Sequence, residues 1–558
     1  MENWCNILQE YWCEGYFSQL FVLWFICRME IEMKKLEVEL FTNDIYDCRD
    51  ILIANVATYV NKEFRLLFVK SWSFFYDSEM QVEFGKKLAS GRFCTSYLVK
   101  KYSGLFLSDF IQIPVDEFIK DIKKNFSEDT WYIVECDLYW CSWDIEYYLI
   151  KHMPHYVLLV GIDEQKGIYV KDPQLAIQGK WISFETLYKA FRGYHYIKVY
   201  EKECKESPQI EDVIKLSLAH LFFGPDGNAF DMMYKFIRDF KTFKLENILD
   251  IHLKNLSEQT LLVRIKNVAM GRKQFASTLE YLYEIHGGEA ILECAEDLKN
   301  IGDRWLAISG MLCKGLFISD VNREKLLEKI NNRLKGLYRE EKEMAVRLKK
   351  ICNNKFEIKT ENNLHNREIV FSENQTYVEL DEYYNAKGIS TTLDYNTQAC
   401  FSTEGRYILL ENLEYSDNIF LVGKIKYKFP RIEKYTFDSI MCMGEKVIIP
   451  NGNYVSLSFL ISADMGNHFE SIIINYDGAL NCEEKIKIPS WLSQQCMFGE
   501  NIAIKGKGVV RVNGIQDIYP FPVHIYSITV PLDTNKKILS IELPLCPNIH
   551  IFSITLCR

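Results

Sequence analysis

Three side chains of this chain have the types and the order of a nucleophilic site. Cys48 follows Asp47, which suits a helix N-cap, and begins an apolar run that continues to Val60. His155 begins an apolar strand pattern, and Asp172 lies in the strand pattern that follows. A thiol nucleophile needs a base, and the base needs a group that orients it. We therefore predict acyl chemistry on Cys48, with His155 as base and Asp172 as orienting carboxylate.

Each of these residues also has a simpler interpretation. Cys48 could be a buried cysteine under its helix, although the unpaired N–H groups and positive dipole end of a helix start favour a thiolate. His155 could be an ordinary core or edge histidine, and its neighbour His152 competes for the role of base. Asp172 could simply open an Asp-Pro turn. The order of the three residues favours catalysis.

The spacing of the two later residues predicts how they meet. A two-residue turn at Glu164 and Gln165 would pair Asp172 with Val157. Asp172 would then lie on the same face of the sheet as His155 and diagonal to it. A register slip of one residue would move it to the other face.

An oxyanion formed during acyl transfer needs hydrogen-bond donors close to the thiol. The backbone N–H of Cys48 is one candidate. A side-chain amide upstream would be the second, and Asn43, beside Thr42, is the amide available there. We predict that Asn43 completes the catalytic set.

A segment rich in aromatic side chains precedes the predicted base. It contains Asp137, Tyr139, Tyr147 and His152, which could line a substrate pocket beside His155. A structural loop held under the sheet explains the same residues equally well.

A zinc site is the rival interpretation of part of this region. Cys136, Cys141, His152 and His155 have a C-x4-C-x10-H-x2-H spacing, which departs from the usual zinc-finger spacing. We therefore expect neither a metal nor a cofactor.

The composition limits the class of protein. The chain has 558 residues, 48% of them apolar, and a net charge of −10. This length predicts two to four domains. Without a large basic block, nucleic acid is a poor candidate partner. The 17 cysteines are scattered with no CxxC pair, which indicates reduced thiols and a cytoplasmic location.

The N-terminal segment 1–33 stands apart from the rest. Its apolar stretch 20–27 is too short to span a bilayer, and neither a basic region nor a small-residue cleavage site accompanies it. We expect a docked helix, or a true start at Met29 or Met33, and no membrane partner.

Composition then changes along the chain, which predicts an α+β multidomain protein. Residues 34–204 mix helical and strand patterns, and residues 205–355 are helical. An asparagine-rich linker spans 356–369, and residues 370–558 have the short, regularly spaced strands of an all-β sandwich.

The individual elements follow from hydrophobic periodicity. Helices are predicted at Cys48–Val60, Phe184–Phe191, Phe230–Phe243, Arg272–Ile285, Ala290–Leu298, Arg304–Leu316 and Val321–Ile351. Strands are predicted at Trp131–Cys136, His155–Ile162 and Ile168–Val170, and then at Lys446–Ile449, Val455–Ile461, Ser471–Tyr476, Ile502–Val512, Val523–Val530, Ile538–Leu543 and Ile549–Leu556.

Two basic motifs stand out in the helical region. Gly271-Arg272-Lys273 and Arg304-Trp305 could hold an acidic carrier or a phosphate. Ordinary helix caps and surface salt bridges are the preferred interpretation.

The first region resembles the N-terminal domain family of butirosin biosynthesis protein H, whose members are papain-like and related to the C39 peptidase fold. The resemblance is carried by Asp47-Cys48, Asp137-x-Tyr139, His152-x-x-His155 with Gly161 and Asp163, Val170-Lys171-Asp172-Pro173, and Trp181-x-x-Phe184. The helical region, with Gly271-Arg272 and Asp303-Arg304-Trp305, resembles the helical partner that often follows, so the resemblance covers about residues 34–350.

This resemblance implies a papain-like cysteine-enzyme domain over residues 34–204. It implies that Cys48 takes an acyl group from a carrier-protein thioester, that His155 shuttles the proton and that Asp172 orients His155. We expect a thiol-dependent acyltransferase or hydrolase of specialised-metabolite biosynthesis, acting on an acyl-carrier protein or peptide and passing the group to a small amine or water. The alternative is a catalytically inactive papain-like protein that presents a peptide, carrier or glycan, and Arg49 beside the thiol favours it.

The last region resembles a bacterial β-sandwich module that is appended to varied enzymes and is lectin-like in layout. The resemblance is carried by Tyr384-Asn385-x-x-Gly388-Ile389, Phe429-Pro430, Gly452-x-Tyr454, Tyr476-x-Gly478, Pro531-Leu532-Asp533-x-x-Lys536-Lys537 and Asn548-x-His550-Ile551-Phe552. The Lys536-Lys537 turn and the aromatic residues could bind a glycan. A purely structural sandwich is an equal alternative.

Overall fold

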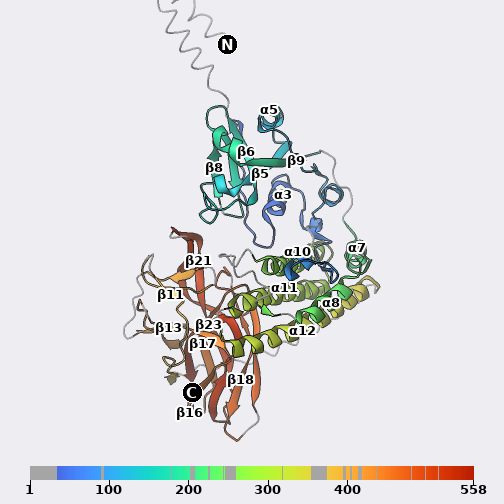
Figure 1. Ribbon diagram of the computed structural model, residues 1–558. Coiled ribbons are helices and arrows are strands. Elements are labelled where there is room, and N and C mark those ends of the chain that lie inside the picture. Colours follow the sequence, from blue (N-terminus) through green and yellow to red (C-terminus); the bar gives the residue numbers. More distant parts are fainter. Residues whose placement is uncertain are drawn as a thin grey trace, which may run out of the picture. The chain divides into compact units, whose positions relative to one another are not determined.

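The structure is a computed structural model that describes residues 34–89, 94–175, 177–200, 208–223, 227–242, 244–245, 259–316, 318–353, 374–393, 397–402, 405–411, 418–434, 436–478, 481–494, 496, 498–512 and 515–558 (Figure 1). The predictions for the segment 1–33 and the linker 356–369 lie outside these residues. The chain divides into two compact units. The first combines Met1–Phe64 with Ser96–Cys204, and the second combines Arg65–Thr95 with Lys205–Arg558.

An antiparallel sheet of seven strands forms the centre of the first unit. Six of them follow the order β4-β9-β5-β6-β7-β8, and β1 pairs with β6. Their bounds are β1 Lys34–Lys35, β4 Phe106–Leu107, β5 Thr130–Asp137, β6 Pro154–Asp163, β7 Gly167–Asp172, β8 Ile177–Ile182 and β9 Phe191–Lys198. The three strands predicted here are present, and each is longer than predicted.

Helices cover this sheet and fix the start of the predicted nucleophile's helix. They are α3 Cys48–Tyr59, the short α4 Ser96–Leu98, α5 Val115–Asn125 and α6 Phe184–Ala190. α3 packs on β5 and β6, and the ring of its last residue, Tyr59, lies 5.0 Å from that of Trp131. Phe118 of α5 packs 4.9 Å from the ring of Tyr194. The buried face of α3, which includes Ile51, Leu52 and Val56, therefore packs on the strands that carry the site.

The register of β6 and β7 agrees with the prediction at the end near the site. Leu158 lies opposite Lys171, which brings Asp172 opposite Val157. Directly opposed residues of an antiparallel pair share a face, so Asp172 faces the same side as His155.

The turn that joins these strands differs from the prediction. Asp163 pairs with Gly167, so three residues lie between them rather than the predicted two. The Asp163 side chain accepts hydrogen bonds from the N–H groups of Gln165 and Lys166, both at 2.8 Å, and stabilises the longer turn. A bulge around Val160 then restores the register.

Within its described residues, the helical part of the second unit has five long helices. They are α7 Ile210–Phe223, α8 Ala229–Phe240, α10 Thr260–His286, α11 Glu289–Gly315 and α12 Asp320–Asn353. The predicted break between Leu298 and Arg304 is wrong, because α11 is continuous there. Gly302 lies inside it, where a Cβ would come within 3.0 Å of the backbone oxygen of Ala269 on α10. This glycine permits close helix packing and does not end the helix.

The segment Arg65–Thr95 packs with these helices, although it was expected to belong to a continuous domain over 34–204. It holds the short strands β2 Phe75–Tyr76 and β3 Leu88–Ala89. Ser71 Oγ donates to the backbone oxygen of Gly271 at 2.9 Å. Trp72 Nε1 donates to Glu341 Oε2 at 2.7 Å. Buried hydrogen bonds thus tie the segment to α10 and α12.

The same contacts settle how the Gly271-Arg272-Lys273 motif is used. The Arg272 side chain is fully buried and forms an ion pair with Glu341 at 2.8 Å. A Cβ on Gly271 would lie 2.3 Å from the backbone oxygen of Ser71. Arg304 pairs with Glu340 of α12. The predicted surface ion pair holds for Arg304, whereas Arg272 lies inside α10, away from either cap, and its ion pair is buried.

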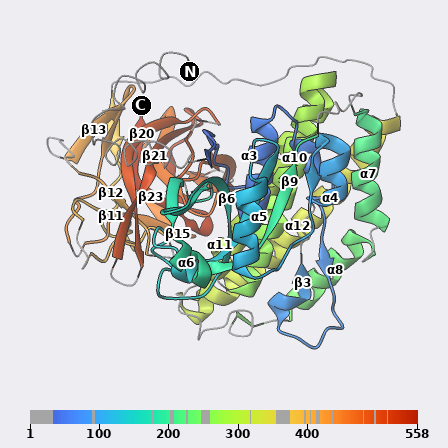
Figure 2. The same cartoon turned by 90° about the horizontal axis from the view of Figure 1, so that it is seen from above.

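The C-terminal part of the second unit is a β-sandwich (Figure 2). Its larger sheet has the order β10-β23-β17-β21-β20-β12-β11, with β15 on β23, and its smaller sheet has the order β16-β22-β18-β19. The bounds are β10 Gln375–Tyr377, β11 Ile389–Ser390, β12 Tyr407–Leu409, β13 Ile419–Val422, β14 Ile425–Lys428, β15 Ile440–Met443, β16 Lys446–Gly452, β17 Ser456–Ala463, β18 His468–Tyr476, β19 Cys482–Ile488, β20 Asn501–Val512, β21 Ile515–Pro531, β22 Ile538–Glu542 and β23 Leu545–Cys557.

The sandwich and the α+β class of the chain are confirmed, and each of the seven predicted C-terminal strands is present. The sequence patterns missed β10 to β15 and β19. None of the helices in the described ranges combines the length and apolar character needed to cross a bilayer.

Candidate active site

Cys48 lies at the start of α3, as the sequence predicts. The side chain of Asp47 caps the helix and accepts hydrogen bonds from the N–H groups of Arg49 and Asp50, at 3.0 and 2.9 Å. Cys48 itself is half-buried, whereas the residues of the following turns are buried. Its thiol therefore combines a helix start with access to solvent.

His155 joins the thiol to a buried carboxylate. Its Nε2 lies 2.8 Å from Oδ2 of Asp172, and both side chains are buried. The Cys48 sulfur is near enough to this imidazole to raise its pKa. Because Asp172 engages Nε2, Nδ1 is the ring nitrogen left for the sulfur. The structure thus brings Cys48, His155 and Asp172 together, and their catalytic roles stay predictions.

The charges around His155 favour its protonated form. Burial alone lowers the pKa of this imidazole, but the Asp172 carboxylate and then the Cys48 sulfur outweigh burial and hold the pKa well above its ordinary value. An imidazolium beside the sulfur would stabilise a thiolate.

Arg49, which follows the thiol, is engaged within the first turn of α3. Its guanidinium donates to Oδ1 of the buried Asp50, with Nε and NH2 at 3.3 and 3.0 Å. Its side chain is 15% exposed. The cation next to Cys48 is therefore paired with a carboxylate of the same turn.

Asn43 lies on the surface, in the turn before α3. Its side-chain oxygen accepts a hydrogen bond from the N–H of Ile45 at 3.1 Å. This oxygen stabilises the local turn, which leaves the side-chain NH2 as the group that could serve an oxyanion. The role of Asn43 stays a prediction.

Trp143 contacts the Asp172 carboxylate, and sequence reasoning did not assign it a role. Its indole Nε1 donates to Oδ2 of Asp172 at 3.3 Å, and the N–H of Leu175 donates to Oδ1 at 3.3 Å. Together with His155, these donors fix both oxygens of Asp172. The aromatic density of the segment was the available signal, but it did not distinguish Trp143 from Trp140.

Asp144 is a second buried carboxyl group close to the first. Burial raises its pKa, the negative charge of Asp172 raises it further, and His155 opposes both. Its Oδ1 accepts the N–H groups of Glu146 and Tyr147 at 2.9 and 3.1 Å. Asp144 therefore holds the turn that follows Trp143.

Asp137, predicted to bind substrate, is used within the protein. It is buried and accepts the N–H groups of Tyr139 and Met153 at 3.1 and 3.2 Å. It also pairs with His152 Nδ1 at 2.7 Å and with Arg192. Although burial raises its pKa, the bonds from His152, Tyr139 and Arg192 hold it below its ordinary value. Asp137 anchors this loop, and Arg192 is a partner that the sequence did not indicate.

The other predicted substrate residues are placed nearer the surface. His152 is exposed and stacks on the ring of Tyr139, with centroids 4.3 Å apart. Tyr147 is half-buried, and the residues after it, Tyr148, Leu149 and Ile150, are exposed. His152 and Tyr139 thus present one aromatic surface, and substrate binding by these residues stays a prediction.

The zinc alternative is not supported by the placement of its histidines. His152 bonds Asp137 and His155 bonds Asp172, while Cys136 and Cys141 are buried beside each other. The four candidate ligands are therefore divided among separate contacts.

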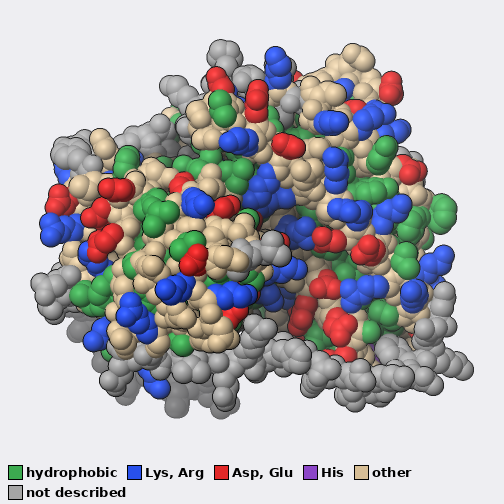
Figure 3. Space-filling model, turned by 90° about the horizontal axis from the view of Figure 1, so that it is seen from below, with side chains coloured by type: hydrophobic (Ala, Val, Ile, Leu, Met, Phe, Trp, Pro, Cys, Tyr) green, Lys and Arg blue, Asp and Glu red, His purple; other side chains and the backbone are tan. Residues whose placement is uncertain are grey.

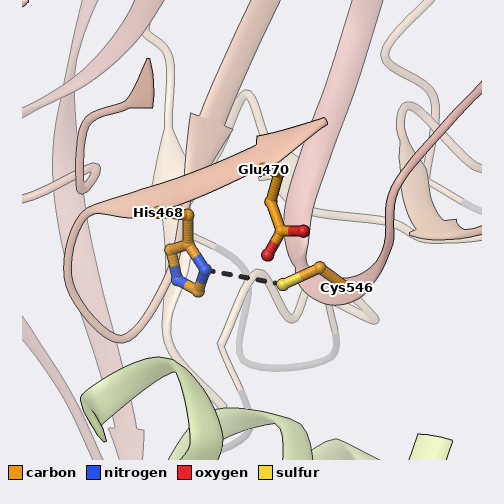
Figure 4. A group of neighbouring side chains, drawn as sticks. All are labelled: His468, Glu470 and Cys546. Carbon is orange, nitrogen blue, oxygen red and sulfur yellow. Dashed lines mark hydrogen bonds between the residues drawn. The ribbon is translucent and has the colours of Figure 1, made fainter. Parts of the chain in front are cut away.

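A different cluster has ligand atoms close enough to share an ion. Figure 4 shows His468 and Glu470 of β18 pointing towards Cys546 of β23, and in the described part of the chain these are the His, Cys, Asp or Glu atoms gathered within 4.8 Å of one another. His468 Nε2 lies 2.8 Å from the backbone oxygen of Asp464, and its Nδ1 lies 3.4 Å from Cys546 Sγ. The thiol thus donates to Nδ1, while Nε2–H donates to the carbonyl.

Charge argues against a metal ion in this cluster. Arg333 and Lys329 of α12 both bind the Glu470 carboxylate, Lys329 at 3.4 Å. Burial raises the pKa of the Cys546 thiol to about 11, which favours the neutral thiol. A divalent cation would add charge beside two cations in a buried space. We interpret the cluster as a polar contact between the sandwich and α12.

Comparison with known families concerns the C-terminal region. Residues 373–558 match the family described as the AziU2-like beta-sandwich domain. The match covers less than half of the chain and agrees with the sandwich seen there. No curated protein matches the chain. The papain-like character of the first unit stays a prediction that rests on its own residues.

Proposed function

We propose that the first unit is a papain-like cysteine domain and that the protein is a thiol-dependent acyltransferase or hydrolase of specialised-metabolite biosynthesis. The observation that supports this is the hydrogen bond between His155 and the buried Asp172, with the Cys48 thiol near the same imidazole and at a helix start. A cytoplasmic location and a carrier-protein or peptide substrate are parts of the same proposal.

The first half-reaction would form an acyl-enzyme. The Cys48 thiolate attacks the carbonyl carbon of a thioester or amide, and the carbonyl oxygen becomes an oxyanion near the N–H of Cys48 and the amide of Asn43. When the tetrahedral intermediate collapses, the bond to the leaving group breaks. The imidazolium of His155 donates its proton to that leaving thiol or amine.

The second half-reaction would release the acyl group. Neutral His155 takes a proton from an amine or water as that molecule attacks the thioester of Cys48. The carbon–sulfur bond breaks, Cys48 leaves as a thiolate, and His155 is again an imidazolium. A thioester and an amine thus give an amide and a free thiol, whereas water gives a carboxylic acid. Transferase and hydrolase differ only in this second nucleophile.

One observation favours the alternative, an inactive papain-like protein that presents a peptide, carrier or glycan. Asn43 is exposed, and its side-chain oxygen is bonded within its own turn, so the second oxyanion donor is less well positioned than the rest of the site. A glycan at the C-terminal sandwich belongs to the same set of proposals.

Alkylation and acyl-enzyme formation would distinguish the two functions. At limiting iodoacetamide, Cys48 should react faster than Cys352, which is also half-buried, and its rate should have a pH midpoint below that of a free thiol. An N-acetylcysteamine thioester should add one acyl group, visible by intact mass. Cys48→Ser should abolish the adduct and Cys352→Ser should retain it. Equal alkylation of both thiols, or an adduct that survives Cys48→Ser, would establish the binding protein instead.

A further inference from the structure

In the second unit α7 and α8 pack against α12 (Figures 1 and 2). A recessed apolar surface is lined by residues of these three helices. It has a volume of about 450 Å³, and its lining includes Phe222, Phe230, Lys342, Val346, Arg347 and Lys350. The rings of Phe222 and Phe230 lie 5.5 Å apart and form its aromatic side. We call this surface the α12 groove.

Apolar side chains are unusually exposed around the α12 groove. Val346 is 53% exposed within it, and Phe223, which follows Phe222, is 85% exposed. Tyr234 of α8 is 60% exposed, with its ring 6.2 Å from that of Tyr338 on α12. Single exposed apolar residues are common, but several beside one recess are typical of an interaction site.

A basic stripe runs along α12 on both sides of Val346. At 100° per residue, one side of the helix gathers a set of exposed cations: Lys335, Arg339, Lys342, Lys349 and Lys350. Within the described residues none of these five forms an ion pair, whereas Arg347 pairs with Asp297 and Glu293. From 335 to 350 the stripe extends about 22 Å, the length of a four-turn helix.

This concentration of positive charge needs an explanation in an acidic protein. The chain has a net charge of −10, and on the face drawn in Figure 3 acidic and basic side chains are interspersed. Like charges three or four residues apart, such as Lys335 with Arg339, destabilise a helix. An anionic partner would turn that cost into attraction.

We propose that the α12 groove binds an acidic amphipathic helix of a partner protein, with apolar side chains entering between Phe222, Phe230 and Val346 and carboxylates meeting the basic stripe. Resting on the proposed function, this partner is the acyl-carrier protein that delivers the thioester. Electrostatic attraction brings the two proteins together, and the recessed apolar surface fixes their register.

The groove favours a protein helix over other anionic surfaces. A phosphate backbone would use the cations but not the recessed aromatic rings, and a flat bilayer surface would not reach into a recess of this size. Glu343 also borders the groove. It would repel a phosphate backbone or an anionic bilayer, whereas a protein helix can place a cation beside this carboxylate.

The test uses the full-length protein and a fluorescently labelled acyl-carrier protein in its apo form, which carries no thioester and cannot react with Cys48. Anisotropy should show saturable binding that weakens as salt increases. We expect K342E/K350E to lower the affinity for the carrier protein about tenfold, and V346D to lower it at least threefold. K485E/K505E, the same charge change at exposed sites of the sandwich, should leave binding unchanged. Charge reversal on the carrier helix should restore binding to K342E/K350E.

Three outcomes would overturn the inference: no saturable binding, equal weakening by K485E/K505E, or tighter Lys342-dependent binding to duplex DNA or to phosphatidylserine vesicles. Cys48→Ser should bind the apo carrier as the native protein does. Docking that persists although no acyl-enzyme forms would retain the α12 groove and reject only the catalytic proposal. An acyl-enzyme that forms without carrier docking would retain the catalytic proposal and reject the α12 groove.

Discussion

At the scale of single residues, the charge on His155 decides what the thiol of Cys48 can do. Burial favours a neutral ring, and the negative charge of Asp172 reverses that preference, so the folded pKa lies well above the ordinary value of 6.5. The stability that this charged contact contributes is complete below about 6.5 and is lost as pH rises through the folded pKa. If the Cys48 thiolate reacts while paired with the His155 imidazolium, its reactivity should also fall as pH rises through the folded pKa of His155.

Replacing Asp172 by Asn tests this balance. The charge that raises the pKa of His155 would be gone, so burial would dominate and the pKa would fall. We expect the alkaline limb of Cys48 alkylation to move to lower pH and the rate at neutral pH to fall about 100-fold. A pH series of iodoacetamide alkylation, followed by mass, measures both. The exposed Glu164→Gln is the control, and a limb that stays in place would refute the role of Asp172.

Replacing Trp143 by Phe should act in the opposite direction on pH. Phe keeps the ring and removes the N–H that donates to Asp172. A carboxylate with one donor fewer attracts the His155 proton more strongly, so the alkaline limb should move to higher pH, by up to about one unit. The same alkylation series measures it, with Trp140→Phe as the matched control. A shift to lower pH, or an equal shift in the control, would show that Trp143 only fills space.

The sequence indicates the cysteine and histidine of the candidate site better than the residues that contact the site's carboxylates. Cys48 and His155 could be predicted because a capped helix start and a strand start are local patterns. Trp143 could not, because its contact with Asp172 depends on the path of an irregular loop. Arg192 could not, because it meets Asp137 across the paired strands β5 and β9, next to a register shift that the sequence does not reveal. Residue type alone does not distinguish Trp140 from Trp143 as the indole that contacts Asp172.

At the scale of elements, the predicted register of β6 and β7 near the site is correct, although the turn that joins the strands is not the predicted one. The alternation of β6 and β7 predicts that Asp172 lies opposite Val157, but it does not reveal that a longer turn and a bulge cancel each other. In α11 an error of the opposite kind arose, because the periodicity predicted two helices, Ala290–Leu298 and Arg304–Leu316, where one continuous helix packs Gly302 against α10. Local patterns specify which residues face the core, while compensating irregularities depend on tertiary packing.

The turn at Gly167 should therefore be sensitive to a single methyl group. Its φ is +102°, and a Cβ would lie 2.1 Å from the backbone oxygen of Ile182 on β8. We expect Gly167→Ala to cost about 2–4 kcal/mol in urea unfolding and to slow Cys48 alkylation as the register loosens. Gly478 has φ +61° with nothing within 4 Å of a Cβ, so Gly478→Ala should cost only about 1 kcal/mol. Equal losses would show that backbone conformation alone, without the contact to β8, explains the effect.

At the scale of the whole molecule, distant parts of the chain build one interior in the second unit. The carboxylate of Glu341 on α12 accepts the indole N–H of Trp72 from the segment Arg65–Thr95, that of Trp305 from α11, and the guanidinium of Arg272 from α10. Dividing the chain by composition places Trp72 in the first domain. Contacts between residues so far apart in the chain leave no local periodicity that would reveal its true place. The division into units therefore could not be predicted as the structure has it.

Glu341→Gln tests whether this network holds the second unit together. The substitution keeps the shape but leaves the Arg272 cation fully buried without a counter-charge, and its NH2 group would face an indole N–H. We expect a loss of about 3–5 kcal/mol in the free energy of unfolding, measured in urea by tryptophan fluorescence. Glu340→Gln, which breaks the more exposed pair with Arg304, should cost less than about 1 kcal/mol.

Because Cys48 belongs to the first unit, its alkylation rate in native buffer should not change. A loss of Cys48 reactivity at urea concentrations that unfold only the Glu341→Gln protein would mean that the two units unfold together, and equal costs for the two substitutions would exclude the buried pair as the organising contact.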